Sequence, residues 1–326
     1  RAFKEKKGAI APFTQSPLWG PSFGDWKSAA FSGAYGALKD WYVENGKVHY
    51  GPAEPQYRNF LKLWADWSKE GLIDRNIAMT DQATRDALIV AGKCGATVGN
   101  TGGGIGYLIK LMAGKDPKAK FVAAPYPVLK RGDKPKFGHR DLPFTKGMVA
   151  ISAQSKNIEA AVRFLDYGYS PEGHMYYNFG TPGVSYNLVD GYPTYSEFIT
   201  ANPKLAMSEA MSETIRGNSG GPFIQDRRYM EQYAALPAQK DSIRIWGNTD
   251  MAKYQLPLIS PSDADSGEMA KIMTEVNTFV NESFTKFVIG VDPVENFDKY
   301  LATLKKLKVD RAIAIYQKAY DTYMKR

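Results

Sequence analysis

Short β-type segments alternate with helix-forming segments through the first half of the chain, and this alternation constrains the fold more than any other feature. Apolar, β-branched or aromatic runs predict strands, and apolar residues at intervals of three and four predict helices. Their alternation is typical of an α/β protein, in which loops at the strand ends hold ligands. Strands are predicted within residues 10–19, 94–99, 121–129 and 147–152, and helices within residues 55–71, 81–91, 105–110 and 158–165.

Other patterns complete the predicted architecture. Asn45-Gly46, between two β-rich arms, predicts a hairpin turn. The last third is helical, because residues 269–284 carry one apolar stripe and residues 297–323 predict two further helices. With 326 residues and 44% hydrophobic composition, the chain is long enough for about two lobes.

The net charge of +8 limits the classes of partner. The basic residues are spread along the chain, which indicates either a solvated basic surface or affinity for an anionic ligand or cell surface. Nucleic acid is not expected, because no basic helix, zinc-finger spacing or RNP-type aromatic motif accompanies the charge. The single cysteine, Cys94, excludes an internal disulfide and a cysteine-based metal cluster, and we expect a small buried thiol there.

A glycine-rich turn follows the predicted strand at 94–99, in the sequence CGATVGNTGGGIGYLIK. A Walker loop would need Lys and then Ser or Thr after its last glycine, whereas Ile105 follows Gly104. The Rossmann spacing also fails, because no glycine lies three residues after Gly104. The turn therefore either presents Asn100, Thr101 and backbone N–H groups to a polar ligand or allows close packing of strand and helix.

No constellation of residues predicts catalysis or metal binding. His49, His139 and His174 have no second ligand at metal-binding spacing. Asp263 and Asp265 could serve as a glycosidase pair, but their serine-rich surroundings equally predict the N-terminal cap of a helix. We therefore expect no catalytic residues, no metal and no cofactor.

Tryptophans outside apolar stripes are the better guide to function. Trp19 and Trp26 lie in a Gly-, Pro- and Ser-rich loop, and Trp246 lies in RIWGNTD, which we interpret as a loop. Such rings either stack on the flat apolar faces of sugars or fill gaps between lobes. Arg140-Asp141 places a guanidinium beside a carboxylate, where the pair could grip a polar ligand.

Several segments, in this order, carry a resemblance to a known family. They are YRNFLKLWADWSKEGLID at 57–74, GKCGATVGNTGGG at 92–104, AISAQSKNIEAAVRFLDYGYSPEGHMYYNFG at 150–180, VDGYPTYS at 189–196 and the C-terminal run that begins FVIGVDPVENFDKY. Together they resemble the extracellular solute-binding proteins of ABC importers, family 1 or LipO-like carbohydrate-binding lipoproteins. The likeness covers nearly the whole chain.

The resemblance implies a periplasmic-binding-protein-like (type II) fold, an α/β clamp of two lobes joined by hinge crossings, here without its N-terminal segment. It makes residues 1–145 the first part of the C-terminal lobe, 146–255 the returning part of the N-terminal lobe and 256–326 a helical return to the C-terminal lobe. The resemblance implies ligand contacts at Trp19, Asn100, Thr101, Arg140 and Trp246. With the residue types considered above, the predicted ligand-binding residues are Trp19, Trp26, Asn100, Thr101, Arg140, Asp141 and Trp246. Calcium is not expected, because KEKKGAIAPF runs directly from helix to strand where many relatives have a calcium-like loop.

The function implied is that of an extracytoplasmic receptor, not an enzyme. It would capture an oligosaccharide, with an acidic one suited to the charge of +8, and deliver it to ABC permease subunits in the membrane. A monomer anchored by an N-terminal lipid is expected. A glycoside-active enzyme and a receptor for peptide or another small solute are the alternatives.

Overall fold

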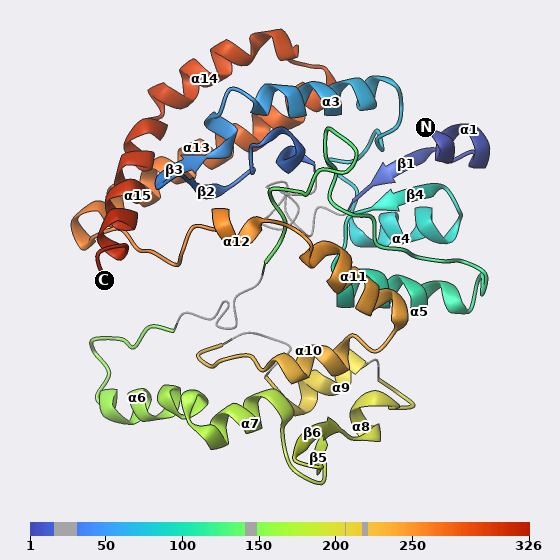
Figure 1. Cartoon of the computed structure of the whole chain (residues 1–326), viewed down its shortest axis with the longest axis vertical. Coiled ribbons are helices and arrows are strands. Elements are labelled where there is room, and N and C mark those ends of the chain that lie inside the picture. The colour runs from blue at the N-terminus through green and yellow to red at the C-terminus, as the bar shows by residue number, and fades with distance from the viewer. Residues whose placement is uncertain (16–30, 141–148, 206, 217–220) are drawn as a thin grey trace. The chain divides into compact units, whose positions relative to one another are not determined.

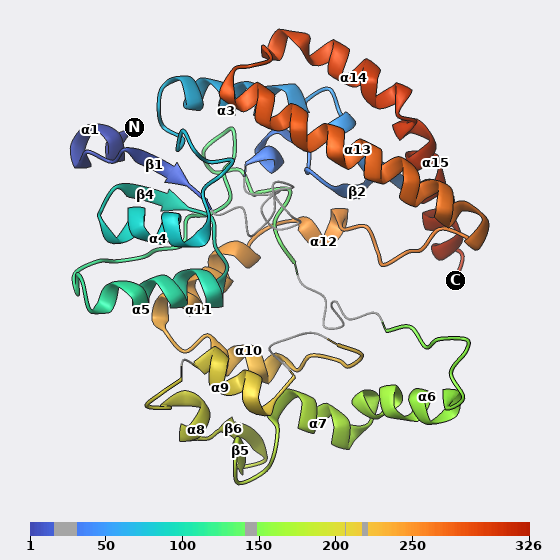
Figure 2. The same cartoon turned by 180° about the vertical axis from the view of Figure 1, so that it is seen from behind.

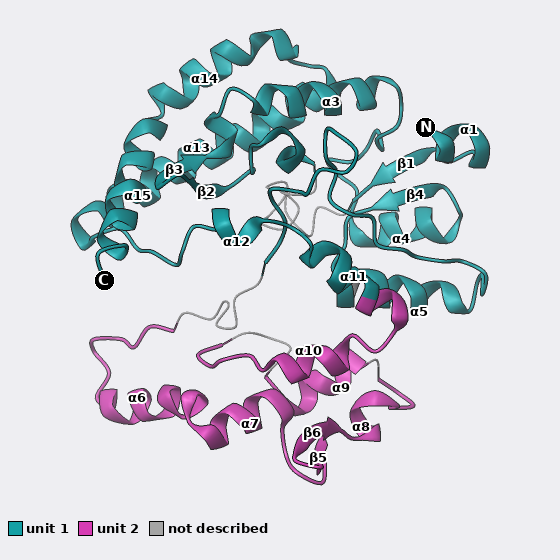
Figure 3. Cartoon of the chain, in the orientation of Figure 1, with its two compact units in different colours: residues 1–140, 241–326 teal, residues 141–240 magenta. Residues whose placement is uncertain are grey.

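The computed structural model describes residues 1–15, 31–140, 149–205, 207–216 and 221–326 (Figure 1). The chain forms two compact units, coloured separately in Figure 3. Unit 1 comprises Arg1–Arg140 and Asp241–Arg326, and unit 2 comprises Asp141–Lys240. The assignment of residues 1–145, 146–255 and 256–326 to particular lobes of a receptor stays a prediction.

Unit 1 contains a small parallel sheet. Strand β1 (Ala11–Thr14) pairs with β4 (Cys94–Thr97), and Phe13 also bridges to Ile73 on the other side of β1. Helix α1 (Ala2–Lys7) precedes the sheet, and α4 (Gln82–Val90), a π-helical turn η4 (Thr101–Gly106) and α5 (Tyr107–Ala113) flank β4 along the chain. The strands and helices predicted at 81–91 and 94–110 are therefore confirmed, as is the strand predicted within 10–19 for the part that the structure describes, residues 10–15.

Cys94 begins β4 and is half-buried. Its Sγ donates to the carbonyl oxygen of Ala96 at 3.2 Å. Desolvation raises the pKa of this thiol, so it stays protonated at neutral pH and has no activated nucleophilic character.

The predicted hairpin is confirmed as β2 (Trp41–Glu44) and β3 (Lys47–Tyr50). Asn45 and Gly46 have φ angles of 52° and 76°, the left-handed conformation that a two-residue turn with matching twist requires. A short 3-10 turn, η2 (Ser32–Tyr35), precedes the hairpin, and another, η3 (Gly51–Ala53), follows it.

Four helices and the hairpin enclose the main core of unit 1. Helix α3 (Tyr57–Lys69) lies along α13 (Asp263–Ile289), and α14 (Phe297–Lys306) and α15 (Val309–Tyr323) cover the same core, with η6 (Val294–Asn296) before them (Figures 1 and 2). Phe60 stacks on Phe284 with ring centroids 5.9 Å apart, and Trp64 lies 5.6 Å from Phe284. The apolar stripes of the sequence are thus the buried faces of α3 and α13. Each fully buried aromatic or aliphatic side chain contributes about 1.5–3 kcal/mol.

Two predicted strands are wrong in the part of the chain that the structure describes. Residues 121–129 run without ladder pairing, because Pro125 and Pro127 have no N–H to donate. Residues 149–152, the described part of the segment predicted at 147–152, are not in a strand either. Apolar, β-branched composition favours extended backbone in both segments, but a strand also needs a neighbouring strand with which to form hydrogen bonds.

Unit 2 is built mainly of short helices around a separate core. Its elements are α6 (Ile158–Asp166), η5 (Tyr167–Tyr169), α7 (Pro171–Phe179), β5 (Tyr186–Val189), β6 (Tyr192–Tyr195), α8 (Glu197–Thr200), α9 (Met207–Thr214) and α10 (Arg227–Tyr233). Helix α11 (Pro237–Gly247) crosses the boundary into unit 1, where α12 (Met251–Tyr254) follows. Phe179, Ile199 and Met211 are fully buried in the core of unit 2.

One edge of the β5–β6 hairpin is closed by a side chain. The amide of Gln232 on α10 accepts from the N–H of Tyr195 and donates to the carbonyl of Pro193, both at 2.7 Å. These backbone groups point away from β5, so Pro193 and its partner Leu188 form a non-hydrogen-bonded pair. The N–H and C=O of Leu188 therefore point to the outer edge of β5, away from β6. Leu188 is 63% exposed.

Candidate ligand-binding site

Four of the seven predicted ligand-binding residues lie in unit 1, and the other three lie outside the described residues. Asn100, Thr101, Arg140 and Trp246 belong to unit 1. Trp19, Trp26 and Asp141 fall in ranges that the structure does not describe.

The glycine-rich turn is packed closely against its own strand end. A Cβ on Gly104 would lie 2.8 Å from the Cα of Gly99, so only glycine fits there without movement. Asn100 caps the π-helical turn, since its Oδ1 accepts from the N–H of Gly104 at 2.9 Å. The packing role considered for these glycines is therefore present, and Asn100, which is exposed, keeps its side-chain N–H groups for a ligand.

Thr101 connects this turn to the helix that carries Trp246. The hydroxyls of Thr101 and Ser242 lie 2.9 Å apart, and Ser242 is fully buried in α11. Ser242 and Trp246 are four residues apart, on one face of that helix. Two predicted site residues, distant in the sequence, thus lie along the same face of α11.

Trp246 lies in the last turn of α11, so its interpretation as a loop residue is wrong. Its Nε1 donates to the carbonyl oxygen of Ala124 at 2.9 Å, and the residue is half-buried. This bond fixes the plane of the indole while leaving part of the ring accessible. The helix was missed because Gly247 and Asn248 directly after the tryptophan have the composition of a turn.

Arg140 follows a segment that packs against Tyr126 and against Thr249, three residues after Trp246. Gly138 is pressed between Tyr126 and Thr249, with a Cβ position 3.0 Å from the Tyr126 ring and 2.6 Å from Thr249 Cγ2. The hydroxyl of Tyr126 accepts from the N–H of His139 at 2.9 Å. Tyr126 is two residues from Ala124, the partner of Trp246, so the structure brings Arg140, Tyr126 and Trp246 onto one region of unit 1.

Gln255 holds Arg140 in place from both ends. Arg140 Nη1 donates to Gln255 Oε1 at 3.2 Å, and Gln255 Nε2 donates to the Arg140 carbonyl at 3.2 Å. Sequence reasoning missed Tyr126 and Gln255, and Tyr126, as an aromatic between two prolines, was the more visible of the two. We call Thr101, Tyr126, Arg140, Trp246 and Gln255 the Trp246 surface.

Polar side chains also gather at the carboxyl ends of the parallel strands. Thr14 Oγ1 and Thr80 Oγ1 each donate to Asp74 Oδ2 at 2.7 Å. Gln15 Oε1 and Thr97 Oγ1, at the ends of β1 and β4, are buried without a hydrogen-bond partner within the described ranges. An unpaired buried polar atom costs about 1–3 kcal/mol, which is tolerated more readily beside a functional site than in a core. Polar residues closing an apolar strand were the sequence signal that could have identified them.

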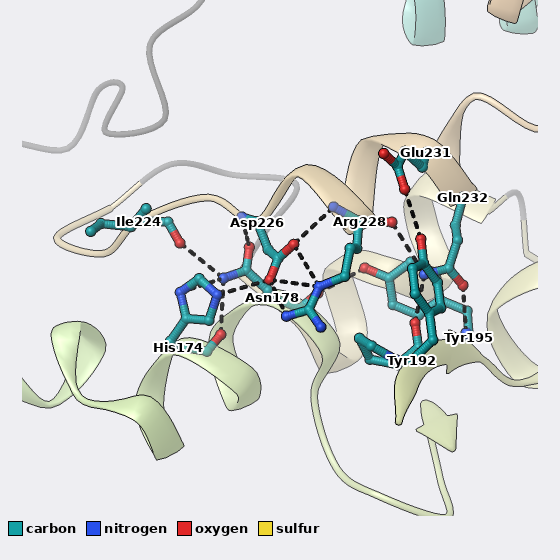
Figure 4. A network of polar contacts seen from close by, with 10 residues as sticks. His174, Asn178, Tyr192, Tyr195, Ile224, Asp226, Arg228, Glu231 and Gln232 are labelled. Atoms are coloured by element: carbon teal, nitrogen blue, oxygen red, sulfur yellow. Dashed lines mark hydrogen bonds and ion pairs between the residues drawn. The ribbon is translucent and has the colours of Figure 1, made fainter. Parts of the chain in front are cut away.

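A separate polar network organises unit 2 (Figure 4). Asp226 accepts from His174 Nε2 at 2.9 Å and from Arg228 Nη2 at 2.6 Å, and its own N–H donates to buried Asn178. Burial opposes ionisation of Asp226, but hydrogen bonds from Arg228 and His174 outweigh it and lower the pKa to about 2. Figure 4 shows this carboxylate between the imidazole and the guanidinium, and its bond to His174 ties α7 to the start of α10.

Asp265 has a structural role rather than that of a glycosidase acid. It lies in the first turn of α13, after the N-cap Ser262, which agrees with the capping alternative. Hydrogen bonds from Ser262 and Lys318 lower its pKa, and Arg311 also pairs with it. A carboxylate held ionised in this way is a poor proton donor at neutral pH.

The rings of His49 and His174 have non-metal partners. His49 Nδ1 lies 2.8 Å from Glu54 and its ring stacks on Tyr42, and His174 pairs with Asp226. Within the described ranges, no group of three or more His, Cys, Asp or Glu side chains could hold a metal ion. No helix in those ranges combines the length and apolar character needed to cross a membrane.

A cavity of about 320 Å³ lies elsewhere in unit 1, between β2, α13 and α15. Trp41, Met269, Met273 and Tyr316 line it, and Trp41 packs 4.6 Å from Tyr316. None of the predicted site residues borders this cavity.

Comparison with known proteins places the chain in a sequence family. The model described as bacterial extracellular solute-binding protein matches residues 1–175, more than half of the chain. An uncharacterized protein in the butB 5' region of Niallia circulans is 27% identical over 275 residues, covering 81% of this chain and 98% of that protein. Lipoprotein LipO of Bacillus subtilis is 28% identical over 169 residues, covering 50% of this chain and 33% of LipO.

Solved structures share the fold. The alginate-binding protein AlgQ2 has a TM-score of 0.72 at 24% identity, covering 98% of this chain and 66% of AlgQ2. An HMO-binding solute-binding protein of Bifidobacterium longum infantis has a TM-score of 0.71 at 18% identity, covering 99% of this chain and 68% of that one. This chain therefore spans about two thirds of the length of these structures and a third of LipO, and it has the two-lobe solute-binding fold predicted for it.

Proposed function

This chain belongs to the family of bacterial extracellular solute-binding proteins, and from that premise we propose that it is the receptor of an ABC transporter for an oligosaccharide. The receptor binds its ligand outside the cytoplasm without making or breaking a bond, and delivers it to permease subunits in the membrane. Function as a monomer and anchoring by an N-terminal lipid are parts of the proposal, the second supported by the likeness to lipoprotein LipO.

The Trp246 surface is the observation that carries this proposal. It combines two half-buried aromatic residues, Trp246 and Tyr126, with the hydrogen-bonding groups of Arg140 and Gln255. Sugars need both kinds of contact, because their C–H faces stack on aromatic rings while their hydroxyls require donors and acceptors. The names of similar proteins support the same ligand class: AlgQ2 is called alginate-binding, another is called HMO-binding, and FusA of S. pneumoniae was solved with kestose.

Trp19, Trp26, Asn100 and Asp141 complete the proposed set of ligand contacts. Asn100 is supported by its exposed amide at the glycine-rich turn. A glycoside-active enzyme is the weaker alternative, since Asp265 is held ionised by Ser262 and Lys318.

Intrinsic tryptophan fluorescence tests the proposal. We expect neutral or uronate-containing oligosaccharides to quench or shift the emission of the chain, with no shortened product on chromatography of the same mixture. Trp246→Ala should weaken binding at least about fivefold, because stacking of an aromatic ring contributes on the order of 1 kcal/mol or more. Trp41→Phe, in the separate cavity, is the matched control and should leave affinity within about twofold. Cleavage of the sugar would refute the receptor function, and unchanged affinity in Trp246→Ala would refute the stacking role.

A further inference from the structure

We infer that the ligand carries a carboxylate and that Arg140 is the residue that binds it, an inference that rests on the proposed receptor function. The guanidinium of Arg140 is exposed and hydrogen-bonds to the neutral amide of Gln255. Within the described part of the chain, no carboxylate lies within ion-pair distance of it. Its charge is therefore not neutralised by a described neighbour.

The neighbouring cations differ from Arg140 in this respect. Lys134 pairs with Asp250 at 2.9 Å, and Lys136 pairs with Glu44 at 2.7 Å. Lys136 also lies over the rings of Tyr254 and Phe137, 4.6 and 5.0 Å from their centroids. Both lysines thus have a carboxylate partner within unit 1, whereas the described partner of the Arg140 guanidinium is the neutral amide of Gln255.

Gln255 also orients Arg140 for a planar anion. Gln255 accepts a hydrogen bond from the side chain through Oε1 and donates one to the backbone carbonyl through Nε2. The backbone of Arg140 and its Nη1 are therefore both held. Nη2 and Nε keep N–H groups that suit a bidentate contact with a carboxylate. A fixed guanidinium loses less side-chain entropy on binding than a mobile one.

The aromatic residues near Arg140 indicate that the carboxylate belongs to a sugar. Tyr126 contacts the Arg140 segment through His139 and Gly138, and Trp246 is bonded to Ala124 two residues earlier. The indole and the guanidinium thus border the same stretch of unit 1, where one ligand could stack on the ring and present a carboxylate to Arg140. The class that fits is a uronate oligosaccharide.

A matched pair of trisaccharides tests this inference. Calorimetric titration of the chain with β-1,4-mannotriose and with β-1,4-mannuronate trimer compares ligands that differ at C6, where a hydroxymethyl group replaces the carboxylate. We expect the uronate to bind at least about tenfold more tightly at low salt, because a charge-assisted hydrogen bond exceeds a neutral one. The difference should shrink in 0.5 M salt, which screens an exposed pair.

Variants assign the effect to one side chain. Arg140→Gln should reduce uronate affinity by about ten- to a hundredfold but mannotriose affinity by only about fivefold, because the neutral sugar loses no charge-assisted bond, and Arg140→Lys should fall between. Arg131→Gln, an exposed arginine in the 130–133 turn, is the matched control and should change neither affinity. Near-UV circular dichroism of each variant verifies that the fold is kept.

The outcomes separate the inference from the proposed function. Equal affinity for the two trisaccharides, or uronate binding that survives Arg140→Gln, would overturn the carboxylate assignment and leave the receptor function standing. If neither trisaccharide binds and no neutral oligosaccharide binds, the receptor function is refuted and this inference with it.

Discussion

Replacing Asp226 by Asn should destabilise the chain by about 2 kcal/mol at neutral pH. The substitution keeps the side-chain shape but removes the charge that binds Arg228 and His174. Depression of the Asp226 pKa from 3.8 to about 2 corresponds to roughly 2.4 kcal/mol of stability. We reduce this to about 2 kcal/mol because the Arg228 side chain is 36% exposed and water screens the pair.

The pH dependence gives the sharper measurement. Because the folded-state pKa of Asp226 lies below the unfolded value, its contribution is complete above pH 4 and is lost as pH falls from about 4 to 2. Urea unfolding followed by circular dichroism, with wild type and Asp226→Asn at each pH, isolates this group from the other carboxylates. The difference in unfolding free energy should be about 2 kcal/mol at pH 7 and about half of that at pH 3.

Asp241→Asn is the control for this prediction. Asp241 pairs with Arg244 at 3.2 Å, but both side chains are more than 60% exposed, so its loss should cost under about 0.5 kcal/mol. If Asp226→Asn destabilises no more than Asp241→Asn, or if its effect does not change between pH 7 and pH 3, the reasoning from the network is wrong.

Two further predictions concern stability and use the same denaturation assay. Gly51→Ala should cost more than about 2 kcal/mol because the new Cβ would lie 1.5 Å from the Leu38 carbonyl oxygen, whereas Gly267→Ala, in α13 with open space around it, should stabilise by about 0.5–1 kcal/mol. Equal effects of these two alanines would contradict the packing argument. Gln232→Ala should cost about 1–2 kcal/mol because it leaves the N–H of Tyr195 and the carbonyl of Pro193 unpaired. Glu231→Ala, which loses an exposed bond to Tyr192 and an exposed ion pair with Arg227, should cost under about 0.5 kcal/mol, and a Gln232 effect this small would refute the role of its amide.

Local chemistry explains which parts of the fold could be predicted from sequence. Asn45-Gly46 specifies its turn within two residues, and the Tyr57, Phe60, Leu61 and Trp64 stripe specifies the buried face of α3 within two helical turns. Residues 121–129 were misjudged because apolar composition indicates extended backbone whether or not a ladder forms. Only the missing N–H groups of Pro125 and Pro127 argued against a strand.

The candidate site was less predictable because its contacts are between distant residues. Arg140 and Gln255 are 115 residues apart, and Thr101 and Ser242 are 141 apart. No periodicity or spacing encodes such pairs. Sequence reasoning could select Arg140, Thr101 and Trp246 by residue type and context, but their partners Gln255, Ser242 and Ala124 required the fold.

The covered edge of the β5–β6 hairpin limits how this chain can self-associate. Gln232 and Pro193 occupy the outer side of β6, so a foreign strand could add only beside Leu188 on β5. In a pair of hairpins joined through their β5 strands, both outer edges would be β6 strands whose outward N–H and C=O groups are already bonded to Gln232. Growth through this hairpin would therefore stop at a pair, and it cannot serve as the repeating contact of a fibril.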